Sequence, residues 1–245
     1  MTQGNQAYQS SSDEKTKNNL FKAYTLIKDF ILLLVIAGLG YGMYTGYELV
    51  TKNKEQLLDV SKTVTQLGTG ISIDNQRRVK IEKGTQMIMS RNKLLKYEVA
   101  MNYAEWFVDE ADKYTNVDFV LLIAIASQES GFDYKAKSPM SAVGLMQLMS
   151  LTAMDMCEYL HMSYDDSLRY DPKTNIRLGA RFVNQLMTRF NDTSIVIASY
   201  NGGAGDGERY KAYKAGLVNQ DYITKETLEY VPKVLGYKKQ YERMM

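Results

Sequence analysis

The distribution of apolar and polar residues divides the chain into a polar leader, one long apolar segment, an amphipathic stretch and a larger region with helical periodicity. Residues 1–25 are mostly polar and show no apolar periodicity, which predicts a disordered leader that faces the cytoplasm. Phe30 to Tyr47 contain no charged residue, and as a helix this segment spans about 27 Å, close to the hydrocarbon thickness of a bilayer. We therefore predict a transmembrane signal anchor over residues 26–48.

The charges that flank the apolar segment predict its orientation. Four lysines lie between residues 15 and 28, while Lys52 and Lys54 follow the segment and weaken the contrast. The excess of lysine before the span favours an N-terminus on the inside, with the rest of the chain on the extracytoplasmic side. A cleaved signal peptide is the competing interpretation, but no small-residue cleavage site follows the apolar segment.

The stretch over residues 49–89 is expected to form a helical stalk or linker. Positions 50–71 show alternating spacings of three and four, as in a short coiled-coil seam, with Asn53 standing among the apolar seam residues Val50, Leu57, Val60, Val64, Leu67 and Ile71. Within the span, Gly38, Gly42 and Gly46 place small residues on one helix face. These two features predict a homodimer through the span or the stalk, and a single amphipathic helix is the alternative. The basic residues over 77–91 indicate either a solvated linker or attraction to an anionic surface.

The remainder of the chain has the periodicity of a mainly α-helical domain. Apolar spacing marks one helix over 94–114, and a second helix begins near Asp118. In this second helix Leu121 and Ile125 lie on one apolar face with Glu129 near its middle, and Gly131 stops the helix. Apolar neighbours and the negative end of the helix dipole both raise the pKa of a carboxyl group, as a general acid requires. The alternative is a Glu129 that pairs with a lysine or arginine.

Composition excludes several classes of site. The chain has 30 basic and 28 acidic residues, a net charge of +2, and no dense basic run, which argues against nucleic-acid binding. A single cysteine, Cys157, forms no internal disulfide, and one histidine, His161, provides no zinc-binding spacing. We therefore predict that the protein uses neither a metal nor a cofactor.

Several short motifs follow the predicted helix in a fixed order: Glu129 to Phe132, Ser138 and Pro139, Gly144 to Met149, Asn175 to Gly179, Ala198 to Gly203, and Glu226, Thr227, Tyr230 and Val231. This series resembles the SLT-type lytic transglycosylases. The resemblance covers roughly residues 90–245. One block is a weak signal, whereas several blocks in order are specific.

The resemblance implies a lysozyme-like helical domain over residues 90–245 that cuts peptidoglycan glycan strands. The cut falls between N-acetylmuramic acid and N-acetylglucosamine. In this family one glutamate acts as acid and then as base, and the C6 hydroxyl of muramic acid closes on C1 to give a 1,6-anhydro end. Glu129 matches that glutamate, and Asp133, Asp165 and Asp166 have no position in the pattern that would place them opposite it.

The resemblance also implies a set of substrate-binding residues: Ser130, Met146, Gln147, Tyr200, Asn201 and Tyr230. Ser130 is expected to orient Glu129 through its hydroxyl, and Tyr200 is expected within reach of Glu129. Gln147 either contacts the glycan or bonds to backbone in the core, and Met146 packs either beneath a sugar ring or in the core.

Two other functions stay open on the sequence alone. The same cleft could hydrolyse the bond and release a reducing end, as in the goose-type lysozymes, which share this fold. A cell-wall binding protein or scaffold without turnover is the second alternative, although such a protein needs no proton donor. The pattern fits equally an enzyme of envelope remodelling, of a secretion or conjugation machine, or of a bacteriophage.

Overall fold

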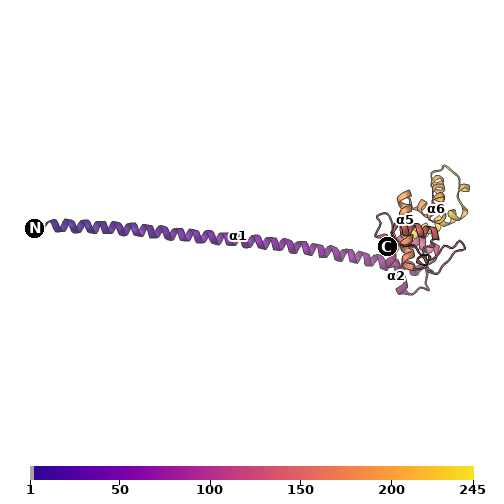
Figure 1. The fold of residues 1–245 in the computed structure, drawn as a ribbon, viewed down its shortest axis with the longest axis horizontal. Coiled ribbons are helices and arrows are strands. Elements are labelled where there is room, and N and C mark those ends of the chain that lie inside the picture. Colours follow the sequence, from indigo (N-terminus) through magenta and orange to yellow (C-terminus); the bar gives the residue numbers. More distant parts are fainter. Residues whose placement is uncertain (1–2) are drawn as a thin grey trace. The chain divides into compact units, whose positions relative to one another are not determined.

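In a computed structural model of the chain, the backbone is described from Gln3 to Met245 and the side chains from residue 17. The described residues are mainly helical (Figure 1), and their β pairing is limited to two isolated bridges, Lys137 with Val143 and Val143 with Leu148. This confirms the predicted mainly α class. The helices are α1 (Gln3–Arg91), α2 (Tyr97–Ala111), α3 (Phe119–Glu129), α4 (Ser150–Tyr159), α5 (Pro172–Phe190), α6 (Thr193–Lys214), α7 (Lys225–Glu242) and the short 3-10 helices η1 (Asp166–Arg169) and η2 (Gln220–Tyr222).

The chain divides into two compact units, residues 1–71 and 72–245. The first unit consists of the greater part of α1. Within it the apolar side chains of the predicted span are exposed, with Phe30 and Leu33 both more than 60% accessible. Among the described helices, α1 is long and apolar enough to cross a membrane, and no residue of its most apolar window is buried in the protein.

The leader differs from the sequence prediction. The sequence predicts no regular structure over residues 1–25, whereas α1 already begins at Gln3. Once a long apolar segment has nucleated a helix, each further residue whose backbone becomes helical adds one hydrogen bond. Because Gly4 is the only glycine before Gly38 and the first proline is Pro139, nothing in this stretch interrupts such an extension.

The second unit begins at Ser72, well before residue 90, where the sequence analysis places the start of the domain. Met87 and Ile88 near the end of α1 are fully buried. A Cβ on Gly84 would lie 3.1 Å from the Cβ of Ala104, so α1 and α2 approach closely at this glycine. The last turns of α1 are therefore part of the core of the second unit.

Ion pairs hold α1 against α2 and give the basic stretch a structural role. Arg77 lies 2.8 Å from both Glu105 and Asp109, and Lys80 lies 2.6 Å from Asp112. The hydrogen bonds to Glu105 and Asp109 raise the pKa of Arg77 above its ordinary value. The basic stretch is therefore not merely a solvated linker, because Arg77 and Lys80 pair with acidic residues of α2 and of its C-cap, Asp112.

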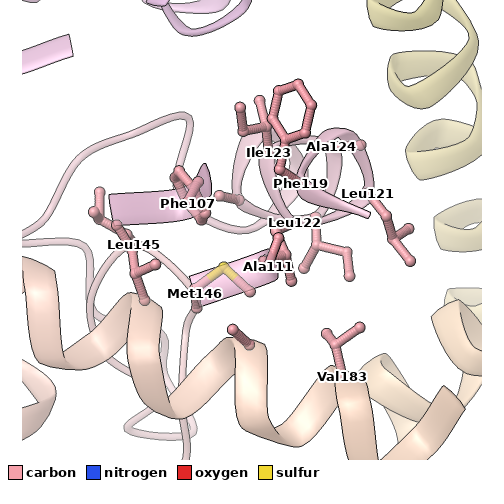
Figure 2. Packing of buried hydrophobic residues seen from close by; sticks show 14 of the residues in the cluster. Phe107, Ala111, Phe119, Leu121, Leu122, Ile123, Ala124, Leu145, Met146 and Val183 are labelled. Carbon is pink, nitrogen blue, oxygen red and sulfur yellow. The ribbon is translucent and has the colours of Figure 1, made fainter. Parts of the chain in front are cut away.

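Helix α3 lies at the centre of the second unit. The Asp118 carboxylate caps it by accepting a hydrogen bond from the Val120 N–H at 3.0 Å. Every residue from Phe119 to Ser127 is buried, as expected for a helix that is apolar on all sides. Figure 2 shows α3 side chains packed with Phe107 of α2 and Val183 of α5. The burial on every face goes beyond the single apolar face predicted from the sequence.

Candidate functional site

The packing of α3 brings its last residue, Glu129, to the wall of a cleft. The helix ends because Gly131 and Phe132 adopt positive φ angles of 56° and 67°, which turn the chain sharply after the glutamate. The cleft has a volume of about 430 Å³. It is lined by Glu129, Ser138, Pro139, Met140, Ala142, Gln147, Leu148, Met149, Thr152, Phe182, Tyr200, Asn201 and Glu226.

The Glu129 carboxyl group is held by a tyrosine. The Tyr230 hydroxyl donates a hydrogen bond to Glu129 Oε1, and no lysine or arginine forms an ion pair with Glu129 among the described side chains. The pKa of Glu129 is raised to about 7. Burial is the largest cause of this rise, the Tyr230 hydrogen bond opposes it, and the nearby charge of Glu226 adds to it. Near neutral pH this carboxyl group therefore exchanges a proton readily, as a general acid and base must.

Two buried tyrosines stand beside the carboxyl group in different roles. Burial and the charge of Glu129 raise the pKa values of both Tyr200 and Tyr230 well above the ordinary range, so both remain protonated donors. The Tyr200 hydroxyl donates to the Met146 carbonyl at 2.7 Å, and the Tyr200 ring lines the cleft 5.2 Å from the Phe182 ring. Of the two, Tyr230 is the one that donates to Glu129, whereas the resemblance implied that Tyr200 lies within its reach.

Gln147 lines the cleft and also bonds to backbone, so it has features of both sequence interpretations. It has a positive φ of 46°. Its Nε2 donates to the carbonyls of Ala136 and Gly144, each at 2.9 Å. These bonds fix the amide plane at the wall of the cleft, and a donor group of a ligand can approach the remaining amide oxygen.

A fully buried amide, Asn175 of α5, holds the loop that carries Gln147. Its Oδ1 accepts from the Met146 N–H at 2.7 Å, and its Nδ2 donates to the carbonyls of Val143 and Arg169 at 2.9 and 2.8 Å. A Cβ on Gly144 would lie 2.4 Å from Asn175 Nδ2, so the loop fits the amide only with glycine there. The sequence analysis singled out the motif of Asn175 but not this function.

Like Tyr230, two further predicted substrate-binding residues lie outside the cleft lining. The Ser130 hydroxyl donates to the carbonyls of Leu145 at 2.8 Å and Ala126 at 3.3 Å, and accepts from the Phe132 N–H at 3.0 Å, so it fixes the turn after Glu129 and forms no hydrogen bond with the Glu129 carboxyl group. Met146 is fully buried and packs on Gly179 in the core (Figure 2). Both residues border the site in sequence, but their side chains face the protein.

Asn201 and a second carboxylate, Glu226, also line the cleft. Asn201 Nδ2 donates to Glu226 Oε1 at 2.9 Å, and both residues line the cleft. Thr227 donates to the buried carboxylate of Asp206 at 2.9 Å and anchors the start of α7 beneath them. In the sequence Glu226 is recognisable only as part of a motif, and its place in the site cannot be predicted beside the aspartates because α7 enters the site from the far end of the chain.

The aspartates considered for that role lie elsewhere. Asp166 pairs with Arg169 at 2.7 Å, and the Asp165 carboxylate accepts from the Ser167 N–H within η1. Asp133 accepts from the Lys135 N–H at 2.9 Å in the loop after α3. None of the three lines the cleft. The described residues contain no group of three or more histidine, cysteine, aspartate or glutamate side chains suited to a metal ion.

Comparison with known proteins gives a family match over the core of this site. Residues 107–223 match the family model described as the transglycosylase SLT domain. The chain is 33% identical over 131 residues to the soluble lytic murein transglycosylase of Escherichia coli, a match that covers 50% of this chain and 20% of that protein. It is 34% identical over 154 residues to the membrane-bound lytic murein transglycosylase C of Yersinia pestis, covering 52% of this chain and 43% of that protein.

A solved structure shares the fold. The chain resembles the 70 kDa soluble lytic transglycosylase of Escherichia coli with a TM-score of 0.51 and 26% sequence identity, over 69% of this chain and 30% of that one. The chain thus spans less than half the length of each of these three proteins. The family match includes Glu129, Gln147, Tyr200 and Asn201, and it ends before Glu226 and Tyr230.

Proposed function

Because this chain carries a transglycosylase SLT domain over residues 107–223, we propose that it is a peptidoglycan lytic transglycosylase with Glu129 as its catalytic residue. The substrate is the β-1,4 bond between N-acetylmuramic acid and N-acetylglucosamine in glycan strands. The observation that carries the proposal is a carboxyl group with a pKa near 7 at the wall of a cleft, hydrogen bonded to a tyrosine rather than paired with a cation.

The proposed reaction needs one carboxyl group for two proton transfers. Protonated Glu129 gives its proton to the glycosidic oxygen as the bond from C1 to that oxygen breaks, and the released chain leaves with a hydroxyl group. The Glu129 carboxylate then takes the proton of the C6 hydroxyl as O6 bonds to C1, which yields the 1,6-anhydro ring and restores the acid. A pKa near the working pH serves both steps, since the group must both give and accept a proton.

Substrate contacts are proposed for the residues that line the cleft. Gln147 and Asn201 offer amide groups to the sugar hydroxyl and acetamido groups, and the Tyr200 ring offers an apolar face. Tyr230 acts on Glu129 rather than on the sugar. Ser130 and Met146 are assigned to the support of the cleft, because Ser130 bonds to backbone and Met146 packs in the core.

Hydrolysis by the same cleft is the second candidate function, and Glu226 favours it. A second carboxylate in the same cleft could activate water, as in glycosidases that use two carboxyl groups. The mass of the released muropeptides separates the two reactions. Products of the full chain that are lighter by one water and lack a reducing end support the transglycosylase, products with free reducing ends identify a hydrolase, and a lack of products from a folded, glycan-binding protein identifies a scaffold.

We propose that α1 anchors the protein in a membrane through residues 26–48, with the catalytic domain on the extracytoplasmic side, where peptidoglycan lies. Support comes from the exposed apolar window of α1 and from relatives whose names describe them as membrane-bound. This localisation fits a periplasmic enzyme of the bacterial envelope and equally a protein of a phage virion.

A homodimer through the span or stalk remains part of the proposal. The seam residues of the stalk are all exposed in the single chain, from 59% for Val60 to 70% for Leu57, so a second copy could bury them. We expect a Val64→Cys variant, whose only other cysteine is the buried Cys157, to form a disulfide-linked dimer on oxidation in membranes. A Thr63→Cys variant, one position off the seam, is the control. Equal yields from both variants, or monomer from both, would argue against the seam.

The pH dependence of turnover follows from the pKa of Glu129. Because the reaction begins with the protonated acid, we expect kcat/KM to fall as the pH rises above about 7. The Tyr230 hydrogen bond lowers the pKa of Glu129, so Tyr230→Phe should raise that pKa and move the fall to higher pH while reducing the maximal rate. Tyr222→Phe, at an exposed tyrosine outside the cleft, should leave the profile unchanged. A fall that moves to lower pH in the Tyr230 variant would contradict the assignment.

A further inference from the structure

The end of α1 contacts the backbone on both sides of Glu129. Arg91 Nε donates to the Ser127 carbonyl at 3.1 Å, and Asn92 Nδ2 donates to the Gly131 carbonyl at 3.0 Å. These carbonyls lie two residues before and two residues after Glu129. The Ser127 carbonyl belongs to the last turn of α3, whose carbonyl groups lack partners within the helix itself, and the Gly131 carbonyl belongs to the turn that follows the helix.

The same turn is closed from its other side by α7. The Arg91 guanidinium lies 5.6 Å from the centre of the Tyr237 ring, and Tyr237 stacks on Tyr241 with ring centres 6.1 Å apart. The Tyr241 hydroxyl shares a hydrogen bond of 2.7 Å with the hydroxyl of Ser127. Since α7 also supplies Tyr230 to the carboxyl group of Glu129, the end of α1 and one face of α7 together enclose the residue from its backbone to its side chain.

The turn that they hold is a strained one. Phe132 has a φ of 67°, in the left-handed region that residues with a Cβ seldom adopt, directly after Gly131 with a φ of 56°. Such a conformation persists where the surroundings fix it. The space beside Gly131 is filled by Arg91, whose Nη2 would lie 3.4 Å from a Cβ at that position. The direction in which Glu129 leaves the helix therefore depends on contacts from α1.

We propose that Arg91 and Asn92 are positioning residues for Glu129, so that the end of the stalk helix is a working part of the active site. The proposal rests on the proposed function of Glu129. It concerns residues outside the family match, which begins at residue 107, and neither side chain lines the cleft. Because a small displacement of a reacting group can cost about 100-fold in rate, loss of these contacts should reduce kcat rather than substrate binding.

Two substitutions in the full chain, purified in detergent, test the proposal. Asn92→Asp keeps the acceptor for the Leu94 N–H, at 3.2 Å, and replaces the donor to Gly131 by a charged carboxylate oxygen. Arg91→Met keeps an apolar stem and removes the donor to Ser127 together with the charge. Lys93→Gln is the matched control, because it removes the next cation along the chain from an exposed side chain that forms no hydrogen bond or ion pair among the described residues.

We expect each of the two variants to lose about tenfold in kcat with KM within about twofold of the wild type, at a temperature where thermal melts show the protein fully folded. Lys93→Gln should retain both parameters. A wild-type kcat in both variants, or a loss that appears only as a higher KM or as a smaller folded fraction, would overturn the positioning role. Glu129→Gln, measured alongside, separates the two proposals. An active Glu129 variant refutes the proposed function itself. An inactive Glu129 variant, together with fully active Asn92 and Arg91 variants, refutes only the positioning role.

Discussion

Replacement of Glu129 by glutamine is expected to abolish turnover of glycan strands, with a loss on the order of 10⁴-fold in kcat, at the upper end of what general acid and base catalysis contributes. The loss should be this large because the proposed reaction takes both proton transfers from one carboxyl group. The amide is nearly the same size and still offers an oxygen to the Tyr230 hydroxyl. Binding of glycan strands should therefore survive, and kcat and binding should be measured on the same preparation.

Substitutions of two other glutamates serve as comparisons for the Glu129→Gln result. Glu98→Gln, at an exposed position of α2 away from the cleft, should retain full activity. Glu226→Gln removes the second carboxylate of the cleft. If the enzyme forms anhydro ends, we expect the Glu226 variant to keep the product type, whereas a hydrolase should lose its activated water. An active Glu129→Gln variant, with either product, would refute the assignment of the catalytic residue.

The candidate catalytic residue, Glu129, and its place in the cleft could be predicted from the sequence because the signal is local. The helix that carries it has apolar neighbours, a cap at Asp118 and a stop at Gly131, and these features lie within fifteen residues of each other. The motif order added Tyr200 and Asn201, which line the same cleft. The local pattern and the ordered motifs therefore predicted these three residues of the cleft.

Side-chain direction could not be predicted in the same way. Ser130 and Met146 each adjoin a cleft residue, yet the first bonds to the Leu145 carbonyl and the second is buried on Gly179. A sharp turn with positive φ at Phe132 and Gln147 sets which side chain faces the cleft, and no periodicity applies to such a turn. The partner of Glu129 likewise depends on how α7 packs against α3, 101 residues away in sequence.

The start of the domain was missed for a related reason. The turns of α1 before residue 90 carry basic residues, and a stretch of this composition resembles a solvated linker. The acidic partners of these basic residues lie on α2 and at its C-cap, 28 to 32 residues further along the chain. Ion pairs between two helices have no fixed spacing in the sequence, unlike pairs within one helix. The buried Met87 and Ile88 belong to a run of three apolar residues, Met87 to Met89, between polar neighbours, a pattern too short to indicate a core helix.

Asn175→Asp should be the most damaging substitution outside the cleft. The amide is fully buried, and its Nδ2 donates to the carbonyls of Val143 and Arg169. A carboxylate of the same shape would face both carbonyls without a proton to donate, so we expect the free energy of unfolding to fall by roughly 3 kcal/mol, measured in denaturant. Turnover should fall as well, because the loop that the amide holds carries Gln147 into the cleft.

The pH dependence of this defect distinguishes its cause. A buried aspartic acid is favoured in its protonated form, so its pKa in the folded state should lie above the unfolded value. The variant should then be closest to wild-type stability at low pH, where the acid donates to one carbonyl, and should lose stability as the pH rises through the folded pKa. Asn184→Asp, at a partly exposed position of the same helix, should show neither effect. An Asn175 variant whose unfolding midpoint matches the wild type at pH 7 would mean that the packing of Gly144 and Met146 against α5, rather than the three hydrogen bonds of the amide, holds the loop at the cleft.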